Sequence, residues 1–194
     1  SEASKKVLNS LNKISKTESS ILLSGLSGSG REFLARKIHF ESNRNNKRFK
    51  VIDFSDLDKV KTEIKLFGSE EKGMIKSVGI LEDVNGGTLF VKNLDKMNSK
   101  IQGKILRVLE EKKYYRIGGL SPNNINFRII SSSKMLLNDL KKCGSFSSDL
   151  LNKINFFEIM VPSIKERNED INDLVKEFLI SSLNFHKMNI ENVS

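Results

Sequence analysis

The sequence predicts an α/β domain in which a central, five-stranded parallel sheet lies between layers of helices. Two observations predict it. Short apolar runs alternate along the chain with amphipathic helical patterns, and a glycine-rich turn joins the first apolar run to a helix. Strands that alternate with helices favour a parallel sheet covered on both faces. The 194 residues are enough for one such domain with a buried core.

Five segments have the short, apolar pattern of buried strands. They are residues 21–23, 49–54, 87–91, 127–131 and 156–160. Helical patterns or long connections separate them, which leaves room for the crossover connections that parallel strands need. No internal repeat interrupts the series.

Apolar residues at helical spacing predict the helices between and around these strands. The helices are expected at residues 4–16, 31–40, 56–67, 100–111, 135–140, 146–154 and 171–183. In the second of them, Phe33, Leu34 and Ile38 share one face. The chain after Pro162 is expected to leave the sheet and to start a second, helical subdomain.

Composition limits the partners and the compartment. The chain has 33 basic and 24 acidic residues, a net charge of +9, but the lysines are scattered without a basic stripe, so we expect no DNA contact by this domain. The single Cys143 and two histidines exclude a disulfide framework and a Cys/His metal site, which predicts a cytoplasmic protein. No run approaches the roughly 18 apolar residues of a membrane span, so no membrane partner is expected. The start at Ser1, without methionine, suggests a piece of a longer protein.

A phosphate-binding loop is predicted where the first strand meets the helix at 31–40. The loop and the start of that helix comprise Gly25, Leu26, Ser27, Gly28, Ser29, Gly30, Arg31 and Glu32. Such a loop directs backbone N–H groups at an anion, and the N-terminus of the next helix adds partial positive charge. A plain flexible turn is the alternative, but the strand before it and the helix after it favour the phosphate loop. The loop keeps the glycine spacing of a P-loop and lacks its lysine and hydroxyl residue.

Seven short motifs, in order, carry a resemblance to a known family. They read GLSGSGRE (25–32), LARKIH (34–39), LFG (66–68), GGTLF (86–90), KILRVLEE (104–111), RIGG (116–119) and VPSIKERNEDI (161–171). This series resembles the central AAA+ domain of bacterial enhancer-binding response regulators, the NtrC class that activates sigma-54 RNA polymerase. The resemblance implies an AAA+ α/β core at residues 1–166 and the beginning of a helical lid at 167–194. It also implies nucleotide contacts by residues 25–32 and Arg167, and receiver and DNA-binding domains outside this chain.

Three replaced residues at the phosphate site follow from the resemblance. Arg31 stands where the family has the lysine that neutralises the β- and γ-phosphates, so it keeps the charge but not the geometry. Lys92 and Asn93 stand where the family has Asp-Glu, for the metal and for activating water. A lysine near a metal position would oppose Mg²⁺ by about 4 kcal/mol for unit charges at 4 Å and an effective dielectric of about 20. Alternatively Lys92 points to solvent, but Asn93 cannot act as a base in either case.

Three further replacements also remove catalytic side chains of the family. Lys134 stands in place of the family's sensor asparagine, and Ser147 and Lys153 stand in place of the paired arginines that reach a neighbouring subunit's γ-phosphate. Such an arginine contributes about 10³ to 10⁵ in rate. We therefore expect no catalytic residue and no metal ligand in this domain.

The segment between Gly68 and Gly79 lacks the GAFTGA hexapeptide with which the family contacts sigma-54. NtrX-like members lack it too, and this chain resembles them. We expect no contact with sigma-54.

Three functions remain open on the sequence alone. The first is a regulatory, oligomerising pseudo-ATPase domain of an NtrX-like two-component regulator, which would reach DNA through its C-terminal domain. The second is an ATPase that uses Lys92 as the phosphate lysine and Asp95 or Asp83 as metal ligand. The third is a nucleotide-binding switch that never turns over. The expected ligand is ATP, ADP or a phosphate or sulfate anion, without Mg²⁺, unless Arg31 or Lys92 pairs with Glu32 or Asp95 and fills the phosphate position.

Overall fold

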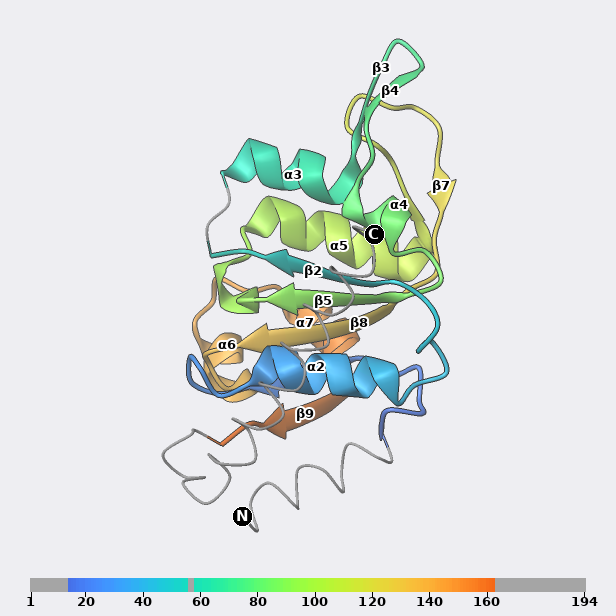
Figure 1. Ribbon diagram of the computed structural model, residues 1–194. Coiled ribbons are helices and arrows are strands. Elements are labelled where there is room, and N and C mark those ends of the chain that lie inside the picture. Colours follow the sequence, from blue (N-terminus) through green and yellow to red (C-terminus); the bar gives the residue numbers. More distant parts are fainter. Residues whose placement is uncertain (1–13, 56–57, 163–194) are drawn as a thin grey trace, which may run out of the picture.

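A computed structural model describes residues 14–55 and 58–162 (Figure 1). The helix expected at 171–183, almost all of the helix expected at 4–16, and Arg167 lie outside the described residues. Within the described residues, no helix is long and apolar enough to cross a membrane.

The central sheet has five strands in the order β2-β5-β8-β1-β9, and every neighbouring pair is parallel. The strands are β1 (Ile21–Ser24), β2 (Phe49–Asp53), β5 (Thr88–Lys92), β8 (Arg128–Ser133) and β9 (Phe157–Met160). This confirms the predicted number and direction of strands. All carboxyl ends therefore lie at one edge of the sheet, here called the carboxyl edge, and all amino ends at the opposite amino edge (Figure 1).

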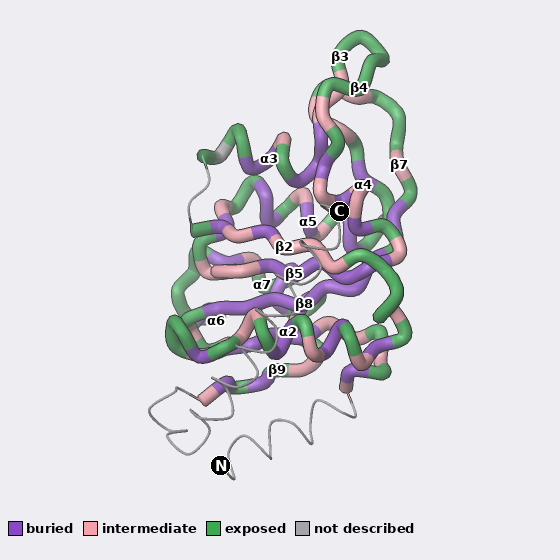
Figure 2. Tube along the Cα trace, in the orientation of Figure 1, coloured by how far each residue is buried: buried purple, intermediate pink, exposed green. Residues whose placement is uncertain are grey.

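Helices cover both faces of the sheet, as predicted (Figure 1). On one face, α2 (Arg31–Phe40) packs Leu34, Ala35 and Ile38 against alternate residues of β1, β5, β8 and β9. The opposite face is covered by α3 (Lys59–Phe67), α5 (Ser99–Glu111) and α7 (Ser148–Ile154), which share one apolar cluster with the other residues of the strands. Figure 2 shows the buried strands between these partly exposed layers.

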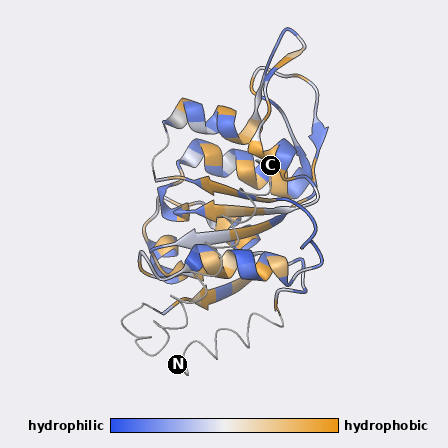
Figure 3. Cartoon of the chain, in the orientation of Figure 1, coloured by the Kyte–Doolittle hydropathy of each residue, from blue (hydrophilic) through white to orange (hydrophobic). Residues whose placement is uncertain are grey.

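Several predicted boundaries were wrong by a few residues. The helix expected at 56–67 starts at Lys59 behind the capping side chain of Asp58, and α7 starts after Ser147, whose hydroxyl accepts a hydrogen bond from Leu150. The helix expected at 135–140 is α6 (Leu137–Lys142). Strand β8 continues to Ser133 because its three serines are buried within the sheet, although their polarity hides the strand pattern. Figure 3 shows β8 as paler than the apolar strands beside it.

The structure adds short elements that the sequence did not predict. They are α4 (Ile80–Asp83), the 3-10 helix η1 (Leu94–Lys96), and two hairpins, β3 (Ser69–Glu71) with β4 (Met74–Ser77) and β6 (Lys113–Tyr114) with β7 (Asn123–Asn124). The β3-β4 hairpin occupies the segment that lacks the GAFTGA hexapeptide. It turns at Lys72 and Gly73, whose φ angles of 51° and 79° are those of a tight two-residue hairpin.

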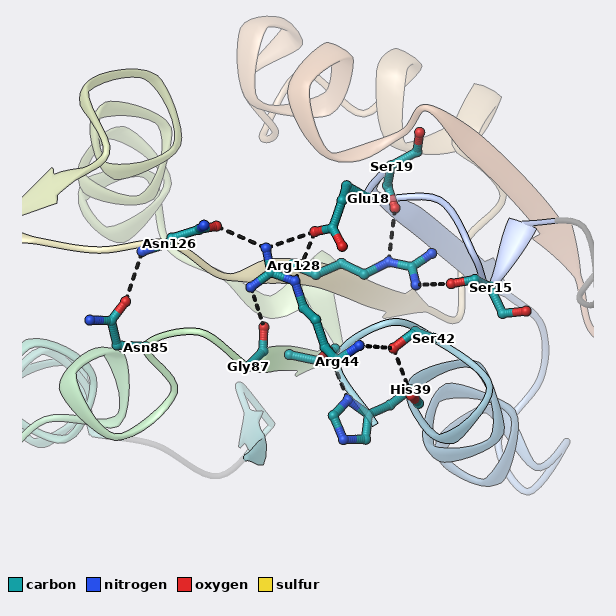
Figure 4. Close-up of polar contacts among 11 residues, drawn as sticks. Ser15, Glu18, Ser19, His39, Ser42, Arg44, Asn85, Gly87, Asn126 and Arg128 are labelled. Carbon is teal, nitrogen blue, oxygen red and sulfur yellow. Dashed lines mark hydrogen bonds and ion pairs between the residues drawn. The ribbon is translucent and has the colours of Figure 1, made fainter. Parts of the chain in front are cut away.

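At the amino edge, Arg128 holds the N-terminal part of the described chain against the sheet (Figure 4). Arg128 is 1% exposed, and its guanidinium donates to the backbone carbonyls of Ile14, Ser15 and Ser19 at 3.0, 2.7 and 3.2 Å. Arg44 reinforces the same segment through an ion pair with Glu18 at 2.7 Å. The segment at 14–19 is thus an integral part of the domain.

Candidate functional site

The candidate site lies at the carboxyl edge, where the predicted phosphate loop leaves β1. Gly25, at φ 155°, passes close to the chain beyond β9: a Cβ atom there would lie 2.5 Å from the carbonyl oxygen of Val161. Gly28 and Gly30 adopt φ angles of 79° and 84°, which side chains disfavour. Three glycines therefore fix the path of this loop.

The loop leads into α2 without a side-chain cap. Gly30 is the N-cap residue, and it has no side chain with which to bind the first N–H groups of the helix. Leu26 is exposed, as are Ser27 and Gly28, whereas Ser29 is buried. An uncapped helix N-terminus behind an exposed glycine loop is an arrangement that binds anions.

Arg31, the first residue of α2, brings a cation to this helix end. It is half-buried, and its Nη1 atom is buried without a hydrogen-bond partner in the part of the chain that the structure describes. Burial lowers the pKa of Arg31, while the negative charge of Asp95 opposes that shift. A buried guanidinium donor without an acceptor is costly, and a bound anion would satisfy it.

Lys92, the last residue of β5, does not point freely into solvent. Its Nζ atom lies 3.1 Å from Oε2 of Glu32 and 3.4 Å from Oδ2 of Asp53. The hydrogen bond with Glu32 raises the pKa of Lys92. The pairing of Lys92 with Glu32 is one of the alternatives left open by the sequence, whereas the contact with Asp53 was not predicted.

Asp53 contacts the candidate site residues Lys92 and Asn93 and was missed by sequence reasoning. Its Oδ1 atom accepts hydrogen bonds from Asn93 Nδ2 at 2.6 Å and from the backbone N–H and hydroxyl of Ser55 at 2.9 and 2.8 Å. Although burial alone would raise it, these donors together with Lys92 lower the pKa of Asp53 to about 2. A polar residue directly after an apolar strand is the signal that could have located it, because parallel strand ends meet at one edge.

Asn93, which by the resemblance stands in place of the water-activating glutamate, has an unusual backbone. Its φ and ψ of 53° and 52° are left-handed, a conformation that asparagine tolerates better than most residues. Its amide donates a hydrogen bond to Asp53, so Asn93 links the carboxyl ends of β2 and β5.

Lys134, the position of the sensor asparagine by the resemblance, directly follows β8 and so lies at the carboxyl edge as well. Lys134 is exposed just after β8, and its backbone N–H donates to Oδ1 of Asp95 at 3.3 Å. Ser133 Oγ donates to the same oxygen at 3.2 Å. Asp95 is thus held by hydrogen bonds from the end of β8, and its negative charge acts on Arg31 through space.

Asp83, the second metal-ligand candidate, lies elsewhere. It ends α4 on the amino side of the sheet (Figure 1) and binds Arg48 and Lys50 at 2.8 and 2.7 Å. The structure therefore does not bring Asp83 together with Lys92, as an ATPase built on these residues would need.

Ser147 and Lys153, at the arginine positions, both have structural contacts. Ser147 caps α7 and its backbone N–H donates to Gln102 Oε1 at 2.7 Å. Lys153 is exposed, and its carbonyl accepts a hydrogen bond from Ser20 Oγ at 3.0 Å.

The residues at the carboxyl edge do not fit a Mg²⁺ ion. Mg²⁺ requires oxygen ligands in octahedral geometry at about 2.0–2.1 Å. Among the described residues, no group of three or more His, Cys, Asp or Glu side chains could hold a metal. Glu32 and Asp53 instead pair with the ammonium of Lys92, which lies between the carboxylate oxygens that a metal would need.

Comparisons with known proteins agree with the motifs in the sequence. A family model described as the sigma-54 interaction domain matches residues 1–160. The nitrogen assimilation regulatory protein NtrX of Azorhizobium caulinodans is 39% identical over 170 residues, which are 87% of this chain and 37% of that protein.

Two solved structures of NtrX from Brucella abortus share the fold. The complex with ADP has a TM-score of 0.84 at 34% identity and covers 93% of this chain and 40% of that one. The complex with ATP has a TM-score of 0.83 at 34% identity and covers 92% and 41%. The chain spans about two fifths of the length of these relatives.

Proposed function

The chain belongs to the sigma-54 interaction domain family, and on that premise we propose that it is the central regulatory domain of an NtrX- or NtrC-type regulator that binds nucleotide without hydrolysing it. One observation carries the proposal. The end of β5, where the family pattern has two carboxylates, holds an ammonium and an amide, and both are engaged by Asp53.

Nucleotide binding is supported by the loop and by relatives. The loop with three positive-φ glycines suits a phosphate group, as does the Nη1 of Arg31, which has no hydrogen-bond partner among the described residues. The Brucella abortus NtrX structures were solved with ADP and with ATP. We propose that residues 25–32 of this chain bind the phosphates of the same nucleotides, Glu32 through its backbone N–H alone, and that Arg167 contributes as the family motif implies.

Hydrolysis lacks a base in this arrangement. A general base must take a proton from the attacking water, and Asn93 cannot. Asp53 is the carboxylate that accepts a hydrogen bond from Asn93, but four contacts hold it as an anion whose pKa is about 2. A carboxylate so strongly stabilised as an anion is a weak proton acceptor.

The remaining parts of the proposal concern the whole protein. We propose that it self-associates, that receiver and DNA-binding domains lie outside this chain, and that DNA is bound through the C-terminal domain. Residues 1–166 would form the AAA+ core and 167–194 the start of its lid, in a cytoplasmic protein. The tight β3-β4 hairpin, which has no hexapeptide, supports the proposal that the domain does not contact sigma-54.

A direct test is to purify the protein without added nucleotide, denature it, and quantify released nucleotide by chromatography, followed by equilibrium binding of ADP and ATP. We expect bound ADP or ATP, or saturable binding of the added nucleotides. The absence of both bound nucleotide and saturable binding would contradict the proposal. A loop variant gives a second test. Gly28→Val places a β-branched residue at φ 79° and should reduce nucleotide binding because the strained backbone disturbs the loop. The sheet should stay intact, because a Cβ at this position meets nothing within 4 Å.

A further inference from the structure

Lys92 occupies an unusual position for a lysine beside a phosphate loop. Its ammonium lies between two carboxylates, Glu32 on the first turn of α2 and Asp53 at the end of β2, at 3.1 and 3.4 Å. All three side chains are about one third exposed, at 33%, 36% and 34%. A single positive charge held by acidic groups from two elements is how proteins commonly hold a cation cofactor.

We propose that the Lys92 ammonium takes the place of the divalent metal in nucleotide binding and makes the site specific for phosphate groups that carry no metal. This inference rests on the proposed nucleotide-binding function and names the form of nucleotide that the site accepts. Lys92 is then a specificity-determining residue, because it supplies internally the charge that Mg²⁺ supplies in other nucleotide sites.

The neighbouring contacts leave little room for Mg²⁺ in addition. Oε1 of Glu32 accepts a hydrogen bond from Arg36 at 2.8 Å, and Oδ1 of Asp53 accepts from Asn93 at 2.6 Å. The second oxygen of each carboxylate faces Lys92. A metal ion bound to the phosphates would therefore be repelled by the ammonium of Lys92. The oxygens of Glu32 and Asp53 would not be available as its ligands, because they already accept contacts from other side chains.

Phosphate itself can still enter. Ion pairs that are this exposed are weak, because water solvates both partners. A phosphate oxygen at the N-terminus of α2 can replace Glu32 as the partner of Lys92 and add charge-assisted hydrogen bonds of its own. Glu32 thus competes with the ligand for the same ammonium.

The test is calorimetric titration of the protein with ADP and with ATP at low salt, in EDTA and in Mg²⁺, for the wild type and for Lys92→Met. We expect Mg²⁺ to weaken binding to the wild type or to leave it unchanged. In Lys92→Met, metal-free affinity should fall about tenfold, and Mg²⁺ should now strengthen binding several-fold, because Glu32 and Asp53 become free to face the metal.

Lys96→Met is the matched control. It removes the same charge from an exposed lysine four residues along the chain, and no ion pair joins Lys96 to either carboxylate in the described structure. It should leave the response to Mg²⁺ as in the wild type. Glu32→Gln provides a second readout that retains Lys92: metal-free binding should tighten a few-fold, because a competing carboxylate is gone.

The outcomes separate this inference from the proposed function. Binding to the wild type that Mg²⁺ strengthens tenfold or more, or a metal response that Lys92→Met leaves unchanged, overturns the role of Lys92 while nucleotide binding stands. No binding of ADP or ATP by the wild type, with or without Mg²⁺, overturns both.

Discussion

The two edges of the sheet each hold a cation at a strand end, but in opposite ways. At the amino edge, Arg128 is 1% exposed and donates to three backbone carbonyls. At the carboxyl edge, Lys92 is one third exposed and faces the side chains of Glu32 and Asp53. Backbone carbonyls bonded to a buried guanidinium cannot leave without breaking the fold, whereas partly exposed carboxylates can exchange for another anion. The first edge is therefore structural and the second is suited to a ligand.

Removing the cation at the amino edge should have the largest effect on stability. Arg128→Met would leave the carbonyls of Ile14, Ser15 and Ser19 without their donor, which we expect to lower the free energy of unfolding by about 3 kcal/mol. Urea unfolding followed by circular dichroism would measure it.

Arg107→Met is the control for that comparison, because Arg107 is 64% exposed, pairs with Glu111 on its own helix and lies over the nearby ring of Tyr115. It should change stability by less than about 0.5 kcal/mol. A loss below about 1 kcal/mol for Arg128→Met would show that the amino edge does not depend on this guanidinium.

Introducing a carboxylate at the carboxyl edge should lower the free energy of unfolding by a smaller amount, which depends on the presence of Asp53. Asn93→Glu would place a second carboxylate beside Asp53, whose Oδ1 now lies 2.6 Å from the Asn93 amide, and would put glutamate at a left-handed φ of 53°. We expect a loss of about 2 kcal/mol in unfolding free energy from repulsion and backbone strain together.

Asp53→Asn in the same chain should recover part of that loss. A double-mutant cycle measured by urea unfolding isolates the repulsion from the strain. Additive effects of the two substitutions would mean that residues 53 and 93 do not interact, contrary to the geometry described above.

The predictions on Arg128 and on Asp53 concern contacts that the sequence could not reveal, in contrast to the strands and the phosphate loop. The five strands and the phosphate loop were predictable because apolar runs and glycine spacing are local signals. Arg128 and Asp53 were not, because their partners lie far along the chain: Arg128 binds carbonyls 109 to 114 residues away, and Asp53 meets Asn93 40 residues on. The pairing of Lys92 with Glu32 was predictable only as one alternative, since spacing does not tell which way a lysine side chain turns.

A pH dependence of stability should arise at the amino edge from His39. This histidine is buried, its Nδ1 lies 2.9 Å from the Thr88 hydroxyl oxygen, and burial lowers its pKa. Because the unfolded chain then binds a proton more readily than the folded one, stability should fall as the pH drops below about 6.5 towards the folded pKa. The slope cannot exceed about 1.4 kcal/mol per pH unit for one proton.

Urea unfolding between pH 7.5 and 5.5 would measure this slope for the wild type and for His39→Gln. The variant should be less stable at pH 7.5 but should lose less between the two pH values. Equal slopes for both proteins would assign the pH dependence to other groups.

The central claim is that the carboxyl edge binds phosphate but has no catalytic set, and phosphate release from ATP tests it most directly. In the presence of Mg²⁺, the purified protein should release no phosphate above the buffer blank, and Arg31→Lys should not change this, because Lys92, Asn93 and the capping Ser147 remain in place. ATP turnover comparable to that of ordinary family members, or its appearance with Arg31→Lys alone, would contradict the account.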